Sequence, residues 1–369
     1  MSAGVDWSSV RTVVVKLGTQ LLVDSYGRLS APLFGRIASQ VAILREKRIN
    51  VTIVSSGAVG AGVAEIGLEK RPTDLARLQA VAAVGQRSLM DAWAGAFAPF
   101  KLHVAQLLLT REDIDDRSRF LNVRNTIHAV QELGGIPIIN ENDTISTDEL
   151  ARITFGDNDM LAAVIASALR ADLLVLLSVV DGILDDNGKS LRVVGSIDEA
   201  RGHIRAEKSA LGKGGMDSKL GAAKLVTDSG EAAIIADGRD EHVLVRILSG
   251  EQVGTLFVPN QRKRSSRSRW IGAARPAGFI HVDDGAAKAV AQKNKSLLPA
   301  GIVKVAGHFA RGDVVEVIGP DGSPVARGLS NYASADVERI SGKKTAEVRT
   351  LLGDAAYDEV VHRDNLVVC

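Results

Sequence analysis

With 369 residues, the chain is long enough for two domains, or for one large domain with an appendage. Hydrophobic residues make up 46% and charged residues 24% of the chain, which is ordinary for a soluble globular protein. The formal net charge of +1 gives no electrostatic argument for nucleic acid or a membrane surface as the main partner.

Strand-like and helix-like segments alternate through the first two thirds of the chain. The expected strands are 11–16, 51–55, 102–109, 136–139, 173–177 and 232–236, and the expected helices are 33–48, 75–97, 117–133, 160–169 and 220–229. This alternation predicts an α/β fold, with a mostly parallel sheet sandwiched by helices.

The remaining chain has a different composition. Residues 261–269 carry five basic residues and three serines without an acid, which is typical of a solvated linker. Beyond Pro276, short strands are expected at 278–282, 301–305, 313–318 and 325–328, with a helix at 286–293. We therefore expect a first domain at 1–260, a basic linker at 261–275 and a small β-rich domain at 276–369.

Cysteine usage and hydropathy narrow the class of protein. The only cysteine, Cys369, excludes disulfides within the chain and cysteine-based zinc sites. No apolar run reaches the ~18 residues of a membrane span, and residues 1–10 lack the layout of a signal peptide. We expect a cytoplasmic protein with no membrane partner.

Two clusters of acids and amides flank one expected strand and open one expected helix. Asn140–Asp143 directly follow strand 136–139, and Gly156–Asp159 directly precede helix 160–169. One Asp or Asn at a helix start is usually a cap. Two clusters at the carboxyl end of a strand, where open α/β sheets bind ligands, favour a site for a cation, an ammonium group or a magnesium-bound ligand.

Three glycine-containing turns are suited to binding an anion, in contrast to the acid–amide clusters. Lys16 precedes the turn at Gly18, three glycines lie at 57–62 after the second strand, and Gly214–Lys219 lead into a helix. Glycines let the backbone approach a ligand whose negative charge faces a helix N-terminus. Each turn alone is explained by a tight strand–helix connection, but together with the acid–amide clusters they indicate a phosphate ligand. Neither the P-loop nor the dinucleotide fingerprint is present.

The segments 15–19, 54–58, 139–143, 155–159 and 214–219 together resemble the glutamate 5-kinases of the amino-acid kinase superfamily. The match spans residues from about 10 to 260, and segments 296–302 and 311–315 are similar to a PUA domain. The resemblance implies ATP-dependent phosphorylation of the side-chain carboxylate of L-glutamate to L-glutamyl 5-phosphate, the first step of proline biosynthesis. It further implies Mg²⁺ with ATP, feedback inhibition by proline and a homo-oligomer.

The resemblance also assigns roles to individual residues. The catalytic residues are Lys16, Lys219 and Asp159, and the substrate-binding residues are Ser56, Gly57, Asn140, Asp143 and Asn158. The nucleotide-binding residues are Lys16, Ser178, Val179, Lys213, Gly214, Gly215, Met216, Asp217, Ser218 and Lys219. Asp143 suits the ammonium of glutamate, while Asp157 and Asp159 orient either the lysines or magnesium-bound water. We predict no side chain as a direct metal ligand.

The residue types agree with the implied chemistry. The side-chain carboxylate of glutamate, with a reference pKa of about 4.3, is ionised at neutral pH and needs no general base. Phosphoryl transfer then requires positioning and neutralisation of charge, which lysines supply. The sequence departs from the family at Val179, where an acid is usual, and at Lys213 and Asp217, where small or hydroxyl residues are usual.

Two other interpretations remain open. An acetylglutamate kinase, aspartokinase or uridylate kinase would share the fold, but acetylglutamate has no free ammonium and uridylate does not require the acid–amide clusters. Alternatively, the PUA-like module makes this an RNA-binding protein with a vestigial kinase fold. Residues 276–369 contain 11 basic and 12 acidic residues and four Phe and Tyr, so RNA is the weaker interpretation.

Overall fold

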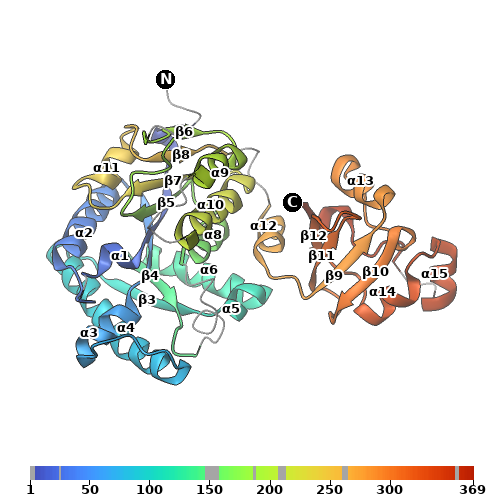
Figure 1. Ribbon diagram of the computed structural model, residues 1–369, viewed down its shortest axis with the longest axis horizontal. Coiled ribbons are helices and arrows are strands. Elements are labelled where there is room, and N and C mark those ends of the chain that lie inside the picture. The colour runs from blue at the N-terminus through green and yellow to red at the C-terminus, as the bar shows by residue number, and fades with distance from the viewer. Residues whose placement is uncertain are drawn as a thin grey trace. The chain divides into compact units, whose positions relative to one another are not determined.

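The computed structural model describes residues 5–24, 26–145, 158–185, 188–206, 213–259, 265–353 and 357–369. The chain divides into two compact units, Met1–Lys263 and Arg264–Cys369, and each has its own sheet (Figure 1). We describe each unit by itself.

The first unit is built on a mostly parallel sheet, as the sequence predicts. Its strands among the described residues are β1 (Thr12–Leu17), β2 (Asn50–Ser55), β3 (Val104–Leu109), β4 (Ile136–Glu141), β5 (Leu173–Ser178), β6 (Val193–Val194), β7 (Ala232–Asp237) and β8 (Thr255–Phe257). The strand order is β3-β4-β2-β1-β5-β7-β8-β6, and only β7 and β8 pair antiparallel. Buried runs of aliphatic residues on the central strands are typical of parallel sheets covered on both faces.

Helices cover both faces of this sheet (Figure 1). They are α1 (Thr19–Leu22), α2 (Ala31–Glu46), α3 (Ala58–Ile66), α4 (Leu75–Phe97), α5 (Arg111–Asp115), α6 (Arg117–Glu132), α8 (Asn158–Leu169), α9 (Ile197–Ala206), α10 (Lys213–Asp228) and α11 (Val243–Leu248). Helices α2, α4 and α11 share a hydrophobic core with alternate strand residues such as Val13, Val15 and Leu17. Helices α6, α8 and α10 contact the strands from the other face.

Helix α10 begins earlier than the sequence predicts. It starts at Lys213 rather than at residue 220, so the glycine-rich segment forms its first turns and does not precede it. Paired glycines are weak helix formers, which masks the start in sequence.

The second unit has a five-stranded sheet of order β10-β9-β11-β12-β13. The strands are β9 (Gly278–Val282), β10 (Ile302–Gly307), β11 (Val314–Ile318), β12 (Pro324–Leu329) and β13 (Leu366–Val368). The helices are α12 (Ser266–Ala273), α13 (Asp284–Lys293), α14 (Ser334–Ile340) and α15 (Thr345–Leu352). Fully buried residues such as Ile280, Val315 and Val317 form a core separate from that of the first unit.

Part of the segment predicted to be a linker folds as helix α12. Trp270 and Ile271 are buried, and the helix packs on β12 and β13. Ser265 caps its start by accepting a hydrogen bond from the Ser268 amide. The helix could not be recognised in the sequence, because its composition is basic and serine-rich and its one apolar face is too short to give a periodic signal.

Candidate active site

The alternation of side chains along β1 directs Lys16 towards helix α8. Val13, Val15 and Leu17 point into the core shared with α2, so Lys16 points to the opposite face. There its Nζ lies 2.6 Å from Oδ1 of Asp159, in the first turn of α8. Both side chains are buried, with exposed fractions of 3% for Lys16 and 0% for Asp159.

A second lysine completes this cluster from a third element. Lys219 Nζ, on α10, lies 3.0 Å from Oδ2 of Asp159 and also donates a hydrogen bond to the Gly215 carbonyl at 3.1 Å. One carboxylate therefore holds two lysines from β1 and α10. The three predicted catalytic residues lie together, and the cluster carries one excess positive charge, which suits an anionic ligand. Of the two roles left open for Asp159, the structure shows the contact with the lysines. Asp157 lies outside the described residues.

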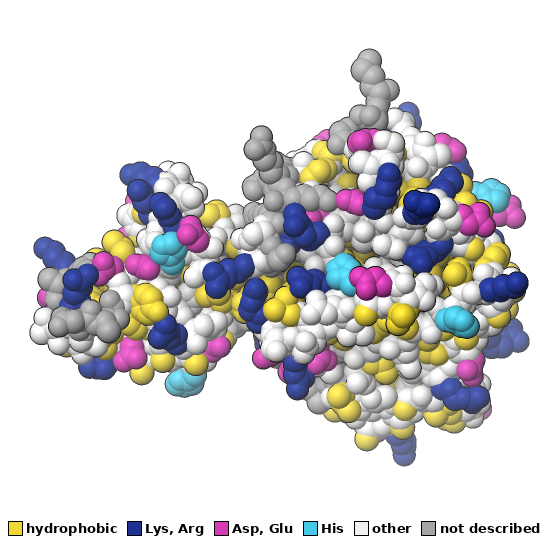
Figure 2. Space-filling model, turned by 180° about the vertical axis from the view of Figure 1, so that it is seen from behind, with side chains coloured by type: hydrophobic (Ala, Val, Ile, Leu, Met, Phe, Trp, Pro, Cys, Tyr) yellow, Lys and Arg dark blue, Asp and Glu magenta, His cyan; other side chains and the backbone are white. Residues whose placement is uncertain are grey.

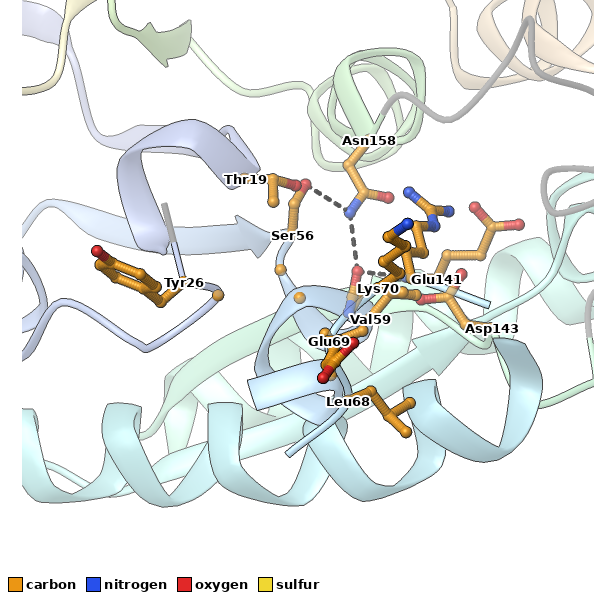
Figure 3. A pocket seen from close by; sticks show the side chains of 17 residues that line it. Thr19, Tyr26, Ser56, Val59, Leu68, Glu69, Lys70, Glu141, Asp143 and Asn158 are labelled. Carbon is orange, nitrogen blue, oxygen red and sulfur yellow. Dashed lines mark hydrogen bonds between the residues drawn. The ribbon is translucent and has the colours of Figure 1, made fainter. Parts of the chain in front are cut away.

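A cavity of about 580 Å³ opens at the carboxyl ends of β2 and β4 (Figure 3). All five predicted substrate-binding residues line it. The other lining residues are Thr19, Tyr26, Gly27, Ala58, Val59, Gly60, Val63, Leu68, Glu69, Lys70, Arg71 and Glu141. The cavity is thus built from strand ends, the starts of α1, α3 and α8, and the segments that follow α1 and α3.

Amide hydrogen bonds tie together the elements that form this cavity (Figure 3). Asn158 Nδ2 donates to the Ser55 carbonyl at 3.0 Å, to Ser56 Oγ at 3.0 Å and to Asn140 Oδ1 at 2.8 Å. The start of α8 is thereby fixed to the ends of β2 and β4. Asn158 and Asp159 are neighbours on α8, yet Asn158 lines the cavity whereas Asp159 contacts the two lysines.

Helix α3 points its N-terminus at the cavity. Gly57 has φ of +101°, a left-handed conformation that favours glycine, and it lies immediately before the helix. Helices α3 and α4 cross closely because two glycines leave room for backbone contact. A Cβ atom on Gly85 would lie 1.9 Å from the Ala58 carbonyl, and one on Gly62 would lie 1.9 Å from the Val81 carbonyl. The start of α3 is therefore held firmly beside the ligand space, where its free N–H groups favour an anion.

Asp143 carries an unusual carboxyl group on the cavity wall. Burial, followed by the nearby charge of Glu141, raises its pKa from 3.8 to about 6, while Arg71 acts in the opposite direction. The charged form of Asp143 is thus costly in the ligand-free protein. A ligand ammonium beside it would relieve this cost.

The structure adds residues that the motifs did not reveal. Lys70 and Arg71, in the segment after α3, are the cations among the described lining residues. On α4, Trp93 donates a hydrogen bond to Ser55 at the end of β2, and Gln86 accepts one from Asn140 near the end of β4. None of the four lies in a recognisable motif, and their positions depend on how α3 and α4 pack on the sheet.

The predicted nucleotide-binding residues lie at the end of β5 and in the first turns of α10. Ser178 ends β5, which pairs with β1 next to Lys16. The Val179 carbonyl accepts a hydrogen bond from Arg239 Nη2 at 2.9 Å, and Val179 packs against the hydrophobic core. Met216, Asp217 and Ser218 follow Gly215 on α10, and the side chain of Lys213 is outside the described set.

Two kinds of feature are absent from the described residues. Within the described ranges, no group of three or more His, Cys, Asp or Glu side chains is arranged to hold a metal ion. Among the same residues, no helix combines the length and the apolar character needed to cross a bilayer.

Comparison with known proteins places the chain in a family. The model of the amino acid kinase family matches residues 11–237, and that of the PUA domain matches residues 278–352. A glutamate 5-kinase of Rhodopirellula baltica is 43% identical over 365 residues, covering 97% of this chain and 94% of that protein. This chain belongs to the glutamate 5-kinases of the amino acid kinase family.

Further glutamate 5-kinases show the same relation. That of Geobacter sulfurreducens is 43% identical over 98% of both chains, and that of Pseudomonas fluorescens is 44% identical over 96% of this chain and 97% of its own. A solved carbamate kinase from Giardia lamblia bound to AMP-PNP gives a TM-score of 0.49 at 18% identity, over 68% of this chain and 99% of that one. The resemblance noted in the sequence, to glutamate 5-kinases and to a PUA domain, is confirmed.

Proposed function

We propose that this protein transfers the γ-phosphoryl group of ATP to the side-chain carboxylate of L-glutamate, giving L-glutamyl 5-phosphate and ADP. This reaction is the first step of proline biosynthesis. The observation that carries the proposal is the identity of 43% to glutamate 5-kinases over almost the whole chain. The lysine cluster and the adjoining cavity supply a geometry that suits the reaction.

The reaction needs no protein base. An oxygen of the glutamate carboxylate, ionised at neutral pH, attacks the γ-phosphorus, and the bond to the β-phosphate oxygen breaks as ADP leaves. Charge on the transferring group is neutralised by Lys16 and Lys219, which Asp159 holds in place at 2.6 and 3.0 Å. The N-terminus of α3, after Gly57, offers N–H groups to the attacking carboxylate.

The cavity provides contacts for the amino-acid end of glutamate. Asp143 is suited to the ammonium group, and Arg71, which acts electrostatically on Asp143, is suited to the α-carboxylate on the same carbon atom. Asn140, Asn158 and Ser56 line the same cavity and are joined by hydrogen bonds, so they are suited to further contacts with the substrate. Proline carries the same charged end without a side-chain carboxylate, so we propose that it binds here and inhibits the enzyme.

The nucleotide is proposed to lie against the end of β5 and the first turns of α10. Mg²⁺ enters with ATP in this proposal, because hard cations in such sites bind mainly to phosphates and water with one or two carboxylates. When bound, the ion would neutralise phosphate charge. We further propose a homo-oligomeric, cytoplasmic enzyme.

RNA remains the weaker alternative for the second unit. On the face seen in Figure 2, basic and acidic side chains of this unit are interspersed and do not gather into one basic patch. RNA-binding surfaces usually combine a basic face with stacking aromatics.

One assay tests the proposal. ADP release is measured with L-glutamate, L-aspartate, acetylglutamate and uridylate offered separately, with ATP and Mg²⁺ present. We expect turnover with glutamate at least tenfold above that with any other acceptor. Turnover with acetylglutamate or uridylate alone would assign the protein to another branch of the family, and turnover with none of them would contradict a kinase function.

A further inference from the structure

Helix α4 places two buried polar side chains beneath the cavity. Gln86 and Trp93 are seven residues apart and so share one face of the helix. Trp93 Nε1 donates to Ser55 Oγ at 3.1 Å, and Gln86 Oε1 accepts from Asn140 Nδ2 at 2.8 Å. Gln86 is 8% exposed and does not line the cavity, so any effect of this residue on a ligand passes through Asn140.

Backbone groups determine how the amides of this network are oriented. The Glu141 amide N–H donates to Asn140 Oδ1 at 2.9 Å, so this atom is the oxygen. The Ser55 carbonyl accepts from Asn158 Nδ2 at 3.0 Å, so that atom is the nitrogen. A backbone N–H can only donate and a carbonyl can only accept, which removes the usual ambiguity of amide groups.

The rest of the chain of hydrogen bonds follows from these two anchors. Asn158 Nδ2 donates to Asn140 Oδ1 at 2.8 Å, so Asn140 must turn its own NH₂ group towards α4. Gln86 is the acceptor there, and its oxygen satisfies that NH₂ group. Without this acceptor, the NH₂ group of Asn140 would be buried without a partner, which favours displacement of the Asn140 side chain from its contact with Asn158.

Two atoms of the network stay without hydrogen-bond partners among the described residues. Asn158 Oδ1 and Gln86 Nε2 are both buried and unpaired. A buried donor with no partner destabilises the folded protein, so Gln86 is a poor choice for stability alone. Asn158 lines the cavity, and its orientation leaves a carbonyl oxygen available to a ligand that donates hydrogen bonds.

We propose that Gln86 is a positioning residue for the amino-acid substrate: it holds Asn140 and, through it, Asn158 so that Asn158 offers its oxygen to the substrate ammonium. This inference rests on the proposed function, because the ammonium belongs to glutamate. The residue acts on binding of the amino acid and leaves the lysine cluster unchanged.

The test compares Gln86→Met with a matched control, Gln131→Met. Gln131 is also a buried glutamine in a helix, and its Nε2 donates to Thr52 Oγ1 at 3.0 Å, away from the cavity lining. Met keeps the volume and helix propensity of glutamine in both variants. We expect Gln86→Met to raise the glutamate KM about tenfold, the effect of one lost buried hydrogen bond, with the ATP KM within twofold of wild type. Gln131→Met should leave both constants within twofold.

A third variant separates positioning from packing. Gln86→Glu keeps an acceptor oxygen for Asn140, so its glutamate KM should lie within threefold of wild type. A folded Gln86→Met enzyme with an unchanged glutamate KM would overturn the inference. If Gln86→Met does not fold, a tenfold rise in the glutamate KM of Gln86→Glu overturns it as well. Failure of the wild type to phosphorylate glutamate would instead overturn the proposed function, since that result does not involve Gln86.

Discussion

Two neighbouring residues of α8 belong to two different kinds of site. Asp159 holds Lys16 and Lys219 through charged contacts, and the three residues come from three separate elements. Asn158 joins a network of neutral amides at the cavity beside the ends of β2 and β4. The charged cluster is suited to stabilising the transferring phosphoryl group, and the amide network is suited to orienting the substrate. This division predicts that variants of the first lower kcat, while variants of the second raise the glutamate KM.

The largest effect is expected from Lys219→Ala in the charged cluster. Removing one preorganised donor should lower kcat by ~10²–10³-fold, with little change in the glutamate KM. Lys224→Ala is a matched control on the same helix, because Lys224 pairs with Asp228 at 2.6 Å outside the cluster. Steady-state kinetics with both substrates measures the effect. Near-normal turnover would remove Lys219 from the catalytic residues.

Asp143→Asn tests the amino-acid side of the comparison. Loss of the charge opposite the ammonium should raise the glutamate KM ~10–100-fold and weaken inhibition by proline in parallel, since a hydrogen bond to a charged group contributes ~1.5–3 kcal/mol. Loss of proline inhibition with an unchanged glutamate KM would show that the two ligands do not share this contact.

The same substitution should make the ligand-free protein more stable at neutral pH. The pKa of Asp143 is raised in the folded protein. Between pH 3.8 and about pH 6, its carboxyl group is therefore mostly ionised in the unfolded chain but mostly protonated in the folded protein, so the stability of the fold decreases as the pH rises through this range. This difference in pKa corresponds to a loss of about 3 kcal/mol at most in the free energy of unfolding at neutral pH. Asparagine does not ionise, so the variant avoids this loss. Thermal unfolding at pH 4 and pH 7 measures the effect. A lower melting temperature for the variant at pH 7 would contradict the raised pKa.

Substrate binding should depend on pH through the same group. Asp143 must be ionised to hold an ammonium, so the glutamate KM should rise up to tenfold per pH unit as pH falls below about 6. The ATP KM should not follow this trend. A flat glutamate KM between pH 5 and pH 7, at constant ionic strength, would exclude Asp143 as the ammonium partner.

The smallest effect is expected at Val179, on the nucleotide side. An aspartate there could accept a hydrogen bond from the nucleotide, so Val179→Asp should lower the ATP KM up to about tenfold and improve discrimination against GTP. Asp181 is a poor substitute acceptor, because it already accepts hydrogen bonds from Ser190 and Arg192. Constants within twofold for both nucleotides would show that Val179 is neutral.

Long elements with a strong pattern could be predicted from the sequence, whereas short ones could not. Helix 75–97 could be predicted with its observed bounds because it is long and alanine-rich. In the structure, the Asp74 side chain caps its start by accepting a hydrogen bond from the Arg77 amide. Short elements such as α1, β6 and α11 carry too few residues for a periodic signal. The paired glycines of α10 and the basic composition around α12 indicated turns and a linker where the chain is helical.

The candidate site shows the same limit in another form. Residues directly after strands, such as Asn140 and Ser56, could be named from sequence because parallel strands end at one edge of a sheet. Arg71 and Gln86 could not, because the chain gives no local indication that α3 and α4 bring them to that edge. In the sequence, Gln86 is one of several polar residues in a long alanine-rich helix, and only the folded structure shows its hydrogen bond with Asn140 of β4.

The shared carboxylate of Asp159 has a consequence for the end of the catalytic cycle. An ammonium group has three protons, so Lys16 and Lys219 can each donate to Asp159 and to a phosphate oxygen at the same time. In the proposed reaction, Asp159 would therefore keep both lysines in place while ADP and the acyl phosphate leave. Because it cancels one of the two positive charges, the same buried acid would also weaken the attraction of the cluster for these products.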